Sequence, residues 1–252
     1  MERSIAWVTG AGHGIGRYVA LELARRGWHV VITSRTESEL HRLADEIQSL
    51  GGMAFVHAGD VTDADAMSCL VQTIEADYGP LDLAILNAGT YVRFGVEDFN
   101  IAAFEMQIDI NVMGTVRCLA PVIKVMTNRR AGRIGVMSSL TAYRGLPMAS
   151  AYGASKAALT NMCEALYPEL ARFGVAISVI HPGFVRTPLT DRNDFPMPFL
   201  VEPDVAARHI VNGLEGERFE IAFPRRLTAL MKIGRLLPYS LYLRVTRKIL
   251  GA

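Results

Sequence analysis

Short apolar runs alternate with stretches of helical periodicity along most of the chain, and this alternation limits the fold more than any other feature. The runs are rich in valine and isoleucine and do not alternate apolar with polar residues, which indicates strands buried on both faces of a sheet. Strict alternation of strand and helix predicts an α/β fold, a parallel sheet with helices on both faces. The predicted strands are Ile5–Thr9, His29–Thr33, Met53–His57, Leu81–Leu86, Arg133–Met137, Val175–Ile180 and Phe219–Phe223.

Stretches of helical period fill the spaces between these strands and carry apolar residues on one face, as helices packed on a sheet require. Pro168 lies inside one of them, and because it lacks an N–H group we expect it to kink that helix or to separate its last turn. No repeat, low-complexity tract or flexible linker interrupts the pattern, so residues 1–252 are interpreted as a single domain. The predicted helices are Gly16–Gly27, Glu37–Leu50, Ala64–Tyr78, Ala103–Val125 and Tyr152–Arg172.

Composition excludes several classes of protein. Half of the 252 residues are hydrophobic and a fifth are charged, as in a globular domain, and the net charge of +1 gives no electrostatic reason to bind nucleic acid. No apolar run approaches the roughly 18 residues of a membrane-spanning helix, and the first apolar run is too short for a signal peptide. The widely spaced Cys69, Cys118 and Cys163 are interpreted as reduced core thiols, so we expect a cytoplasmic protein without a metal site.

The segment TGAGHGIG, Thr9–Gly16, directly follows the first predicted strand and leads into the first predicted helix. A helix N-terminus presents free backbone N–H groups and the positive end of the helix dipole, and glycines let the backbone approach a phosphate closely. The spacing Gly10-x-x-x-Gly14-x-Gly16 matches neither G-x-G-x-x-G nor a P-loop. A plain turn would not need four glycines, so this segment is predicted to bind a phosphate group.

The glycine loop resembles the cofactor loop of the short-chain dehydrogenase/reductase family, and further motifs of that family follow in the family order. A Tyr-x-x-x-Lys pair often arises by chance, but the ordered set is specific. The family usually has a second asparagine at position 86, where this chain has leucine. The resemblance covers residues 4–190, and its other motifs are Asp60-Val61, Asn87-Ala88-Gly89, Asn111, Ser139, Tyr152 with Lys156 in YGASKAAL, and Pro182-Gly183 with Thr187.

This resemblance implies a doubly wound, Rossmann-type sheet of seven parallel strands that binds NAD(H) or NADP(H) across the carboxyl ends of its strands. The phosphate at the glycine loop would then be the dinucleotide pyrophosphate. Asp60 and Val61 would hold the adenine, and residues 87–89 would lie against the adenosine ribose. The cofactor-binding residues that the resemblance implies are Gly10, Gly12, His13, Gly14, Ile15, Gly16, Ser34, Arg35, Asp60, Val61, Asn87, Ala88, Gly89, Tyr152, Lys156, Pro182, Gly183, Val185 and Thr187.

The end of the second predicted strand indicates which dinucleotide is bound. An acidic residue there would accept hydrogen bonds from the ribose 2′-OH of NAD, but the chain reads ITSRT over residues 32–36. Arg35 is a fixed cation whose fork of donors suits a phosphate, and Ser34 adds a hydroxyl. His13 stands where many NADP-preferring relatives carry Arg or Lys. These residues favour NADP(H). The alternative is that the protein binds NAD(H) and that Arg35 is a solvated surface residue.

Tyr152 and Lys156 are four residues apart and share one face of their predicted helix. A phenol has an ordinary pKa of about 10, and a nearby ammonium group is expected to lower that pKa toward the working pH. The resemblance makes Tyr152 the group that gives or takes the proton, and it gives Lys156 the hydroxyls of the nicotinamide ribose. The hydride belongs to the cofactor.

Two further residues complete the catalytic set that the resemblance implies. The family serine lies thirteen residues before the tyrosine, which selects Ser139 over Ser138, and its hydroxyl would orient the substrate oxygen. Asn111 would hold a water that relays protons to Lys156. Without the family, Asn111 is an ordinary polar residue in a predicted helix, bonded to the backbone.

Residues 188–202 follow the cofactor motifs as a long apolar loop and are interpreted as the substrate loop. This loop and residues before the predicted catalytic helix would wall a hydrophobic pocket, so we expect an apolar ketone, aldehyde or secondary alcohol. A surface loop that packs on its own domain is the alternative. The expected wall residues are Phe195, Met197, Pro198, Phe199 and Leu200, with Leu140, Tyr143, Leu146 and Met148.

Residues 225–252 form a basic amphipathic C-terminal segment. From residue 222 to the end the chain has seven lysines and arginines and no acidic residue, and large apolar residues recur at helical spacing. Such a segment can lie on an anionic membrane, pack on a second subunit, close over the substrate site, or dock as a terminal helix with a solvated basic face. The resemblance also implies a homo-oligomer.

The sequence therefore predicts an oxidoreductase that transfers a hydride between NADP(H) and a carbonyl group or secondary alcohol. The main alternative is a regulator of the same fold that binds dinucleotide without turnover. Such regulators typically lack the tyrosine or the lysine, and this chain has both. A dehydratase or epimerase on a similar scaffold usually has a longer C-terminal region than this chain.

Overall fold

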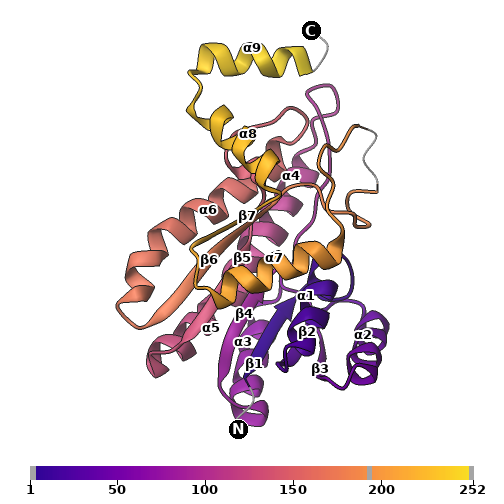
Figure 1. Ribbon diagram of the computed structural model, residues 1–252, viewed down its shortest axis with the longest axis vertical. Coiled ribbons are helices and arrows are strands. Elements are labelled where there is room, and N and C mark those ends of the chain that lie inside the picture. The colour runs from indigo at the N-terminus through magenta and orange to yellow at the C-terminus, as the bar shows by residue number, and fades with distance from the viewer. Residues whose placement is uncertain (1–3, 192–194, 250–252) are drawn as a thin grey trace.

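One sheet of parallel strands, in the order β3-β2-β1-β4-β5-β6-β7, organises the computed structural model, which describes residues 4–191 and 195–249 (Figure 1). The predicted strands occur within two residues of their expected bounds, which confirms the seven-stranded parallel sheet. The strands are β1 Ile5–Thr9, β2 His29–Ser34, β3 Met53–Ala58, β4 Leu81–Leu86, β5 Gly132–Met137, β6 Val175–Pro182 and β7 Glu220–Phe223.

The strand order reverses between β1 and β4. From β1 the chain moves outward through β2 and β3, and it then crosses back to β4 and moves outward on the other side. Because all the strands are parallel, the loops after their carboxyl ends lie along one edge of the sheet, and a crevice forms where the two directions diverge. The loop after β1 is the glycine loop, so the topology places it at this crevice.

Helices fill the connections between the strands. They are α1 Gly14–Arg25, α2 Glu37–Ser49, α3 Ala64–Thr73, α4 Ile101–Ile108, α5 Gly114–Arg129, α6 Ser150–Ala171 and α7 Pro203–Glu215, with π-helical turns η1 Ile74–Tyr78 and η2 Asp109–Met113 and a short 3-10 helix, η3 Leu140–Ala142. α1, α2 and α7 pack on one face of the sheet, and α3, α5 and α6 pack on the other. Helices on both faces complete the doubly wound fold that the sequence predicts.

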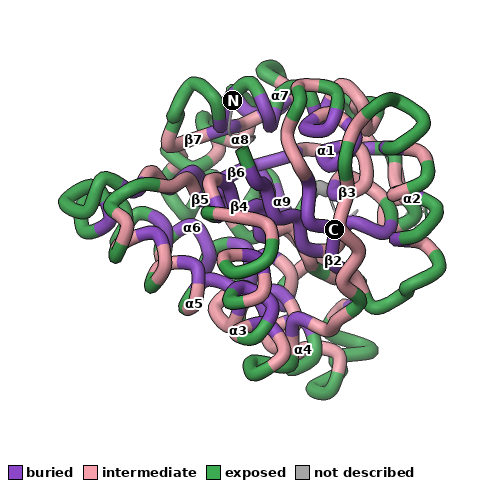
Figure 2. Tube along the Cα trace, turned by 90° about the horizontal axis from the view of Figure 1, so that it is seen from below, coloured by how far each residue is buried: buried purple, intermediate pink, exposed green. Residues whose placement is uncertain are grey.

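β1 supplies side chains to two hydrophobic layers, which explains its unbroken apolar run. Val8 belongs to the layer that contains Val19 of α1, and Trp7 belongs to the opposite layer with Leu119 of α5. The Trp7 indole N–H donates to Thr33 Oγ1 at 2.9 Å, so its polar group is satisfied inside the core. Figure 2 shows buried segments through the middle of the molecule and exposed residues on the outer loops. The two edge strands are exceptions: β3 is only partly buried and β7 alternates partly buried with buried residues, so the expected burial on both faces is wrong for both.

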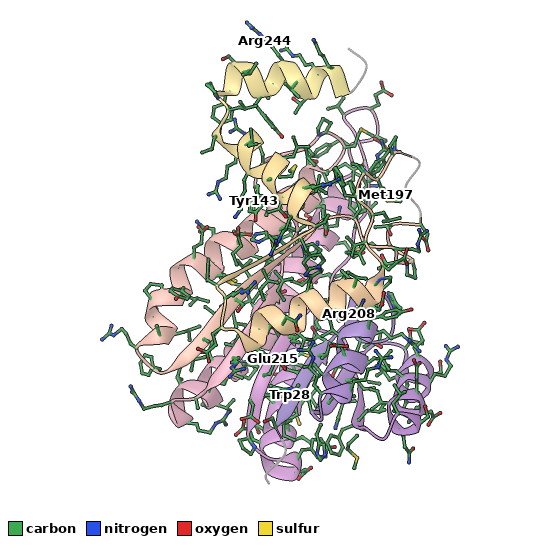
Figure 3. The ribbon with its side chains drawn as sticks, in the orientation of Figure 1. Trp28, Tyr143, Met197, Arg208, Glu215 and Arg244 are labelled. Carbon is green, nitrogen blue, oxygen red and sulfur yellow. The ribbon has the colours of Figure 1, made fainter. Side chains whose placement is uncertain are left out.

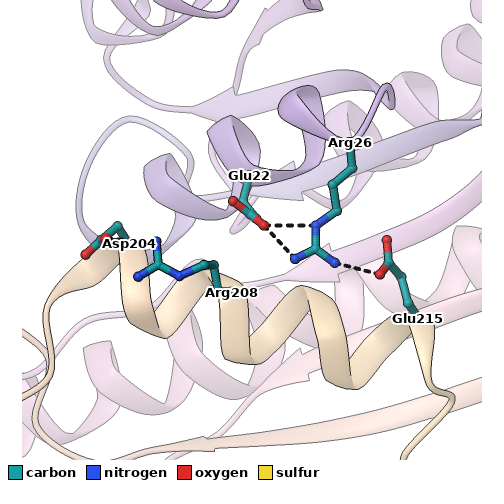
Figure 4. Close-up of polar contacts among 5 residues, drawn as sticks. All are labelled: Glu22, Arg26, Asp204, Arg208 and Glu215. Carbon is teal, nitrogen blue, oxygen red and sulfur yellow. Dashed lines mark hydrogen bonds and ion pairs between the residues drawn. The ribbon is translucent and has the colours of Figure 1, made fainter.

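A cluster of charges ties α7 to α1. Figure 3 labels Arg208 and Glu215 on α7, and Figure 4 shows their surroundings. Arg26 follows α1 and donates to Glu22 one turn earlier at 2.9 Å and to Glu215 at the end of α7 at 2.6 Å. Arg208 pairs with Asp204 along α7 itself. These contacts fix the helix on which the 188–202 loop ends.

α6 continues through Pro168 to Ala171, so the expected separation of its last turn is wrong. The proline lacks the N–H group that would bond to the carbonyl of Glu164, but only three helical residues follow it. The missing bond therefore affects the end of the helix, four turns away from Tyr152 near its start.

The three cysteines differ in burial. Cys118 and Cys163 are buried, and burial raises the pKa of each thiol to about 12. Cys69 is exposed on α3, so its assignment to the core is wrong. α3 turns Met67 and Val71 toward the core, and position 69 falls on the opposite side of the helix.

One helical run within the described residues, Ile101–Arg129, is long and apolar enough to cross a membrane by length and composition alone. It consists of α4, η2 and α5, and 39% of its most apolar window is buried. This run packs against α3, β4 and α6, so its apolar residues serve contacts within the fold.

Two helices, α8 Arg225–Leu236 and α9 Tyr239–Ile249, follow β7 and form most of the predicted C-terminal segment. They extend beyond the sheet at the end opposite the N-terminus (Figure 1). Leu227 of α8 packs with Leu140 and Tyr143 in a small hydrophobic cluster of its own. Residues 250–252 of the predicted segment lie outside the described residues.

Candidate active site

The glycine loop between β1 and α1 adopts a conformation that glycine allows easily. Gly10 and Gly14 have positive φ angles of 65° and 58°, in the left-handed region. A Cβ at Gly16 would collide with Asn87 Nδ2 and the Gly10 carbonyl oxygen, so this position has no room for a side chain. α1 has no acidic residue in its first turn, and His13 before it makes no side-chain cap. The loop therefore leaves a helix N-terminus open, as anion binding requires.

Asn87 holds the glycine loop against the loop after β4. Its backbone N–H donates to Thr9 Oγ1 at 2.9 Å, and its side-chain amide donates to the carbonyls of Thr9 and Gly10 at 2.9 and 3.2 Å. The Ala88 N–H donates to the same Thr9 hydroxyl at 3.1 Å. The Asn87-Ala88-Gly89 motif thus braces β1 and β4 at the floor of the crevice.

The crevice beside the carboxyl ends of β1, β2 and β4 brings together many of the predicted cofactor residues. The Asp60 carboxylate accepts hydrogen bonds from the N–H and the hydroxyl of Thr62, both at 2.9 Å, so Asp60 also shapes its own turn. Gly12 and Gly16 are not among the described residues that line the crevice. The predicted residues that do line this half are Gly10, His13, Gly14, Ile15, Ser34, Arg35, Asp60, Val61, Asn87, Ala88 and Gly89.

The wall at the end of β2 holds a buried hydroxyl without a protein partner. Ser34 Oγ makes no hydrogen bond to any of the described residues. Arg35 and Thr36 line the same wall. A buried polar group normally has a partner, so an orphaned hydroxyl beside an arginine fits an oxygen-rich ligand group such as a phosphate.

Glu39 is a residue of this wall that sequence reasoning missed. It lies in the first turn of α2 and forms an ion pair with His13, with Oε2 to Nδ1 at 3.5 Å. A Cβ at Gly12 would come within 2.6 Å of Glu39 Oε2, so a side chain there would displace the Glu39 carboxylate. The available signal was its position, one helical turn after Arg35 at the start of a predicted helix.

Tyr152 and Lys156 stand in the second half of the crevice, beside the carboxyl ends of β5 and β6. Lys156 Nζ donates to the Met137 carbonyl at 2.7 Å and lies 5.6 Å from the centre of the Tyr152 ring. Asn87 and Gly89 line both halves, so the crevice runs continuously from the glycine loop to Tyr152. The predicted residues that line this half are Ser139, Tyr152, Lys156, Pro182, Gly183, Val185 and Thr187.

The expected lowering of the Tyr152 pKa is wrong. Burial raises the pKa of Tyr152 to about 12, the hydrogen bond with Ser139 opposes the shift, and the nearby Tyr91 adds to it. Lys156 is buried as well, and burial lowers its pKa to about 8. Its ammonium group bonds to the Met137 carbonyl rather than to the phenol. Loss of hydration therefore outweighs the attraction between the two side chains.

The two serines after β5 have different surroundings. The Ser139 hydroxyl forms a hydrogen bond with the Tyr152 phenol and accepts the Thr141 N–H at 3.2 Å. The Ser138 hydroxyl instead donates to the Lys156 carbonyl at 2.9 Å and lies 3.0 Å from the Thr160 hydroxyl. The structure thus places Ser139 beside the phenol and Ser138 beneath the backbone of α6.

Asn111 is buried in the η2 turn and is not among the described residues that line the crevice. Its side-chain oxygen accepts the Thr90 N–H at 2.7 Å, and its amide donates to the Thr90 carbonyl and to Ser155 Oγ, both at 3.0 Å. A Cβ at Gly89 would lie 3.1 Å from Asn111 Oδ1 and 3.5 Å from Lys156 Nζ. Asn111 therefore ties the loop after β4 to α6, next to the Lys156 ammonium group.

Tyr91 brings a second phenol to the site, and sequence reasoning missed it. Its ring meets the Tyr152 ring edge-on, with the ring centres 5.0 Å apart. Tyr91 belongs to the loop after β4, two residues beyond Gly89. That position next to the Asn87-Ala88-Gly89 motif was its only signal in the sequence.

Part of the expected hydrophobic wall lies elsewhere. Leu140 and Tyr143 are buried with Leu227 in the cluster under α8, and the Tyr143 hydroxyl donates to Glu220 at 2.6 Å. Their assignment to the substrate pocket is wrong, because α8 covers them.

The 188–202 loop is described except for residues 192–194, which lie outside the described residues. Phe195 meets Phe184 edge-on with ring centres 6.0 Å apart, and the Arg93 guanidinium lies 5.1 Å from the Phe195 ring centre. Val201 pairs with Val185 in a parallel bridge. Both ends of this loop are therefore anchored beside the crevice.

Comparison with known proteins adds the family. A family model for short chain dehydrogenases matches residues 4–195. The chain belongs to the short-chain dehydrogenase family. Members of this family are oxidoreductases that bind NAD(P)(H), so the resemblance in the motifs is confirmed.

Relatives match over most of this chain. An uncharacterised oxidoreductase of Myxococcus xanthus is 36% identical over 249 residues, which cover 99% of this chain and 98% of the relative. Ketoacyl reductase HetN of Nostoc is 30% identical over 243 residues, which cover 92% of this chain and 85% of the relative.

Solved structures of short-chain dehydrogenases share the fold. A variant of actinorhodin polyketide ketoreductase with NADPH has a TM-score of 0.82 and 26% identity, over 90% of this chain and 97% of that one. A short-chain dehydrogenase of Streptomyces avermitilis has a TM-score of 0.83 and 25% identity, over 98% of this chain and 96% of that one. Both confirm the doubly wound fold.

The described side chains offer no obvious metal centre. Within residues 4–191 and 195–249, no group of three or more His, Cys, Asp or Glu side chains is arranged to hold a metal ion.

Proposed function

We propose that the protein transfers a hydride between NADP(H) and a carbonyl group or secondary alcohol of an apolar substrate. The observation that carries this proposal is the continuous crevice in which Ser139 and Tyr152 share a hydrogen bond beside Lys156, within reach of the glycine loop. A hydroxyl and a protonated phenol that converge on one point suit a substrate oxygen, and the rest of the crevice suits a dinucleotide.

The residues present fit NADP(H). The open N-terminus of α1 would hold the pyrophosphate, and Arg35 with the orphaned Ser34 hydroxyl would hold the 2′-phosphate. Glu39 adds a negative charge to this wall, and its carboxylate lies 3.5 Å from His13 Nδ1. The end of β2 has no acidic residue for the 2′-OH of NAD. The NADPH in the similar ketoreductase structure supports the same choice.

When bound, the cofactor supplies the hydride. With a pKa of about 12, Tyr152 keeps its proton at neutral pH, which is the state that donates to a carbonyl oxygen during reduction. Ser139 would donate a second hydrogen bond to the same oxygen, where negative charge develops. Oxidation of an alcohol would run through the reverse proton transfer.

Lys156 and Asn111 would organise the nicotinamide side. A pKa of about 8 leaves most of the Lys156 side chain protonated at neutral pH, so it can donate to ribose hydroxyls next to Gly89. Asn111 would position that region through its bonds to Thr90 and Ser155. The water relay through Asn111 stays part of this proposal.

An apolar ketone fits the substrate side. Met137, Val185 and Leu189 line the crevice near Tyr152, and the Tyr91 ring stands against the phenol. The names of two similar proteins, a ketoacyl reductase and a polyketide ketoreductase, describe reduction of ketones on acyl chains. Both observations favour a carbonyl compound with an aliphatic or aromatic body.

The alternative, a regulator that binds dinucleotide without turnover, is not favoured, because the chain has the tyrosine, the lysine and the serine in one crevice. We also propose that the protein is a homo-oligomer, as the family resemblance suggests, and that it is cytoplasmic, as its three free cysteines suggest. Light scattering of the purified protein would measure the oligomer.

The experiment that tests the activity follows NADPH absorbance with a panel of apolar ketones and aldehydes, and with sugar and charged carbonyls for comparison. Tyr152→Phe should lower turnover about 10²- to 10⁴-fold with NADPH binding nearly unchanged, because it deletes only the transferable proton. Full activity of this variant would reject the mechanism. Tight NADPH binding without turnover across the panel would favour the regulator.

A further inference from the structure

The C-terminal arm, residues 225–249, is held in a defined orientation on the loop that follows Ser139. Arg144 donates to the carbonyls of Arg235 and Leu237 at 2.8 and 3.1 Å. Its guanidinium lies between the rings of Tyr239 and Tyr242, 4.4 Å from each ring centre. The Tyr242 hydroxyl also donates to the Gly145 carbonyl at 2.6 Å. These contacts hold the arm in a fixed position on the body, so its outer surface has a single orientation.

One face of α8 packs on the body, and the opposite face is apolar and exposed. Leu227 packs in the cluster with Leu140 and Tyr143. Three-residue spacing puts the exposed apolar residues of α8 on one side of the helix. The row and its exposed fractions are Leu230 59%, Ile233 60% and Leu236 84%. Isolated exposed leucines are ordinary on a protein surface, but a row of three large side chains marks a contact surface.

Positive charge surrounds this row. The segment after residue 222 has seven lysines and arginines and no acidic residue. Because the net charge of the whole chain is +1, the residues before this segment carry a net charge of −6. On α9, Arg244, Arg247 and Lys248 lie opposite the buried Tyr242 and Thr246. Figure 3 shows Arg244 on the outer side of the helix, directed away from the sheet. This separation of charge would turn the arm toward any negatively charged surface.

We propose that the C-terminal arm is a docking surface for an anionic lipid bilayer. The row from Leu230 to Leu236 would enter the boundary between headgroups and acyl chains. The lysines and arginines would lay their alkyl stems on the same surface and place their charges on lipid phosphates.

A bilayer fits this surface better than a protein partner does. The core of a protein interface is depleted of charged residues, especially lysine, and its charges need partners in fixed positions. Here basic residues lie close to the exposed row, as Arg226 lies one turn before Leu230 and Arg235 lies next to Leu236, whereas Lys232 pairs with Glu220 of the body. A fluid anionic surface accepts such interspersed charges without fixed geometry.

The position of the arm would bring the substrate side of the crevice to the membrane. The arm follows β7, and the carboxyl ends of parallel strands share one edge of the sheet. Figure 1 shows α8 and α9 at the same end as the loop between β4 and α4. That loop and the start of α4 expose Val96, Phe99 and Ile101. These apolar side chains would extend the contact beside the crevice.

Vesicle binding tests the proposal without any need for turnover. The full chain is sedimented with vesicles of phosphatidylcholine alone and of phosphatidylcholine mixed with phosphatidylglycerol, at low and at high salt. We expect binding to the mixed vesicles that falls at high salt, and little binding to phosphatidylcholine alone.

Two arm variants and two matched controls give the decisive comparison. Reversal of three exposed charges on α9, in Arg244→Glu with Arg247→Glu and Lys248→Glu, should lower the partition coefficient about a hundred-fold. Leu230→Gln with Ile233→Gln should lower it at least about tenfold, because it removes apolar insertion and keeps the charge. The control for the charge reversal changes three exposed arginines of the body, in Arg42→Glu with Arg172→Glu and Arg218→Glu. The control for the apolar variant is Leu50→Gln, at an exposed leucine of the body.

The controls should bind vesicles as the unaltered chain does, and thermal unfolding by circular dichroism checks that every variant is folded. Unchanged binding by both folded arm variants would overturn the proposal. Equal binding to neutral and anionic vesicles would overturn it as well. Loss of an oligomer in the arm variants, without vesicle binding by the unaltered chain, would show instead that the arm is a contact between copies.

Discussion

His181 is a buried imidazole directly before Pro182, at the Tyr152 end of the crevice, and we expect it to make folding sensitive to acid. Its Nε2 lies 3.1 Å from the Thr160 hydroxyl, and its Nδ1 makes no hydrogen bond to any described residue. Burial lowers the pKa of His181 to about 4; Glu220 opposes this shift, and Lys232 adds to it. The Tyr143 ring stacks on the imidazole, with ring centres 4.8 Å apart.

The direction and size of the effect follow from these pKa values. As pH falls, the unfolded chain takes up this proton near 6.5, while the folded protein resists it until pH is near 4. Stability from this group is therefore intact above pH 6.5 and is lost progressively between 6.5 and 4. For His181 alone, a change from pH 7.5 to pH 5 should lower the free energy of unfolding by about 2 kcal/mol.

Urea unfolding at these two pH values measures the effect. His181→Asn should cost stability at pH 7.5, because it leaves space in a packed region and removes the bond to Thr160. Its loss of stability between pH 7.5 and pH 5 should nevertheless be about 2 kcal/mol smaller than that of the unaltered chain. The control is His41→Asn, at an exposed histidine of α2, which should leave the difference as it was. Equal pH dependence of the His181→Asn variant and the unaltered chain would refute the reasoning.

Three predictions concern the crevice. Arg35→Asp should weaken NADPH binding about ten- to a hundred-fold relative to NADH, because it replaces the phosphate partner by a repelling charge, and an unchanged ratio in fluorescence titration would exclude the role. Ser139→Ala should lower kcat about a hundred-fold, whereas Ser138→Ala should cost about 1–3 kcal/mol in urea unfolding with a smaller loss of kcat; the reverse pattern would exchange their roles. NADPH binding should weaken as pH rises through about 8, where Lys156 loses its charge while Tyr152 stays protonated. Constant affinity well above that pH would separate Lys156 from the cofactor.

The sheet could be predicted because each strand is recognisable from its own short run of residues. A strand buried on both faces must be mostly apolar, and the runs of the five central strands are, so their direction follows from the alternation with helices. The edge strands β3 and β7 depart from this rule, since each has no neighbouring strand on its outer side. Whether an apolar strand is buried depends on the elements that pack against it, and the sequence of that strand alone does not indicate these neighbours.

The residues of the candidate site could be predicted to the extent that short spacing places them. Tyr152 and Lys156 share a turn of α6, and Ser139 lies two residues after β5, beside that turn, so local geometry brings them near one another. Tyr91 lies in the loop after β4 and Glu39 lies in α2, and sequence spacing does not predict that either residue reaches the site. Leu140 and Tyr143 were expected in the pocket because of their nearness in sequence, but α8 covers them from eighty residues further along the chain.

The Tyr152 pKa shows most clearly where local reasoning ends. Helical spacing places an ammonium group near the phenol, and in water such a pair would favour the phenolate. Inside the fold, both charged forms lose hydration, and the Met137 carbonyl takes the ammonium hydrogen bond that the phenolate would need. The outcome depends on how deeply the two groups are buried and on the position of the Met137 carbonyl at the end of β5, and neither follows from the spacing of Tyr152 and Lys156. Burial thus moves the pKa of Tyr152 away from neutral pH, whereas spacing alone predicts a shift toward it.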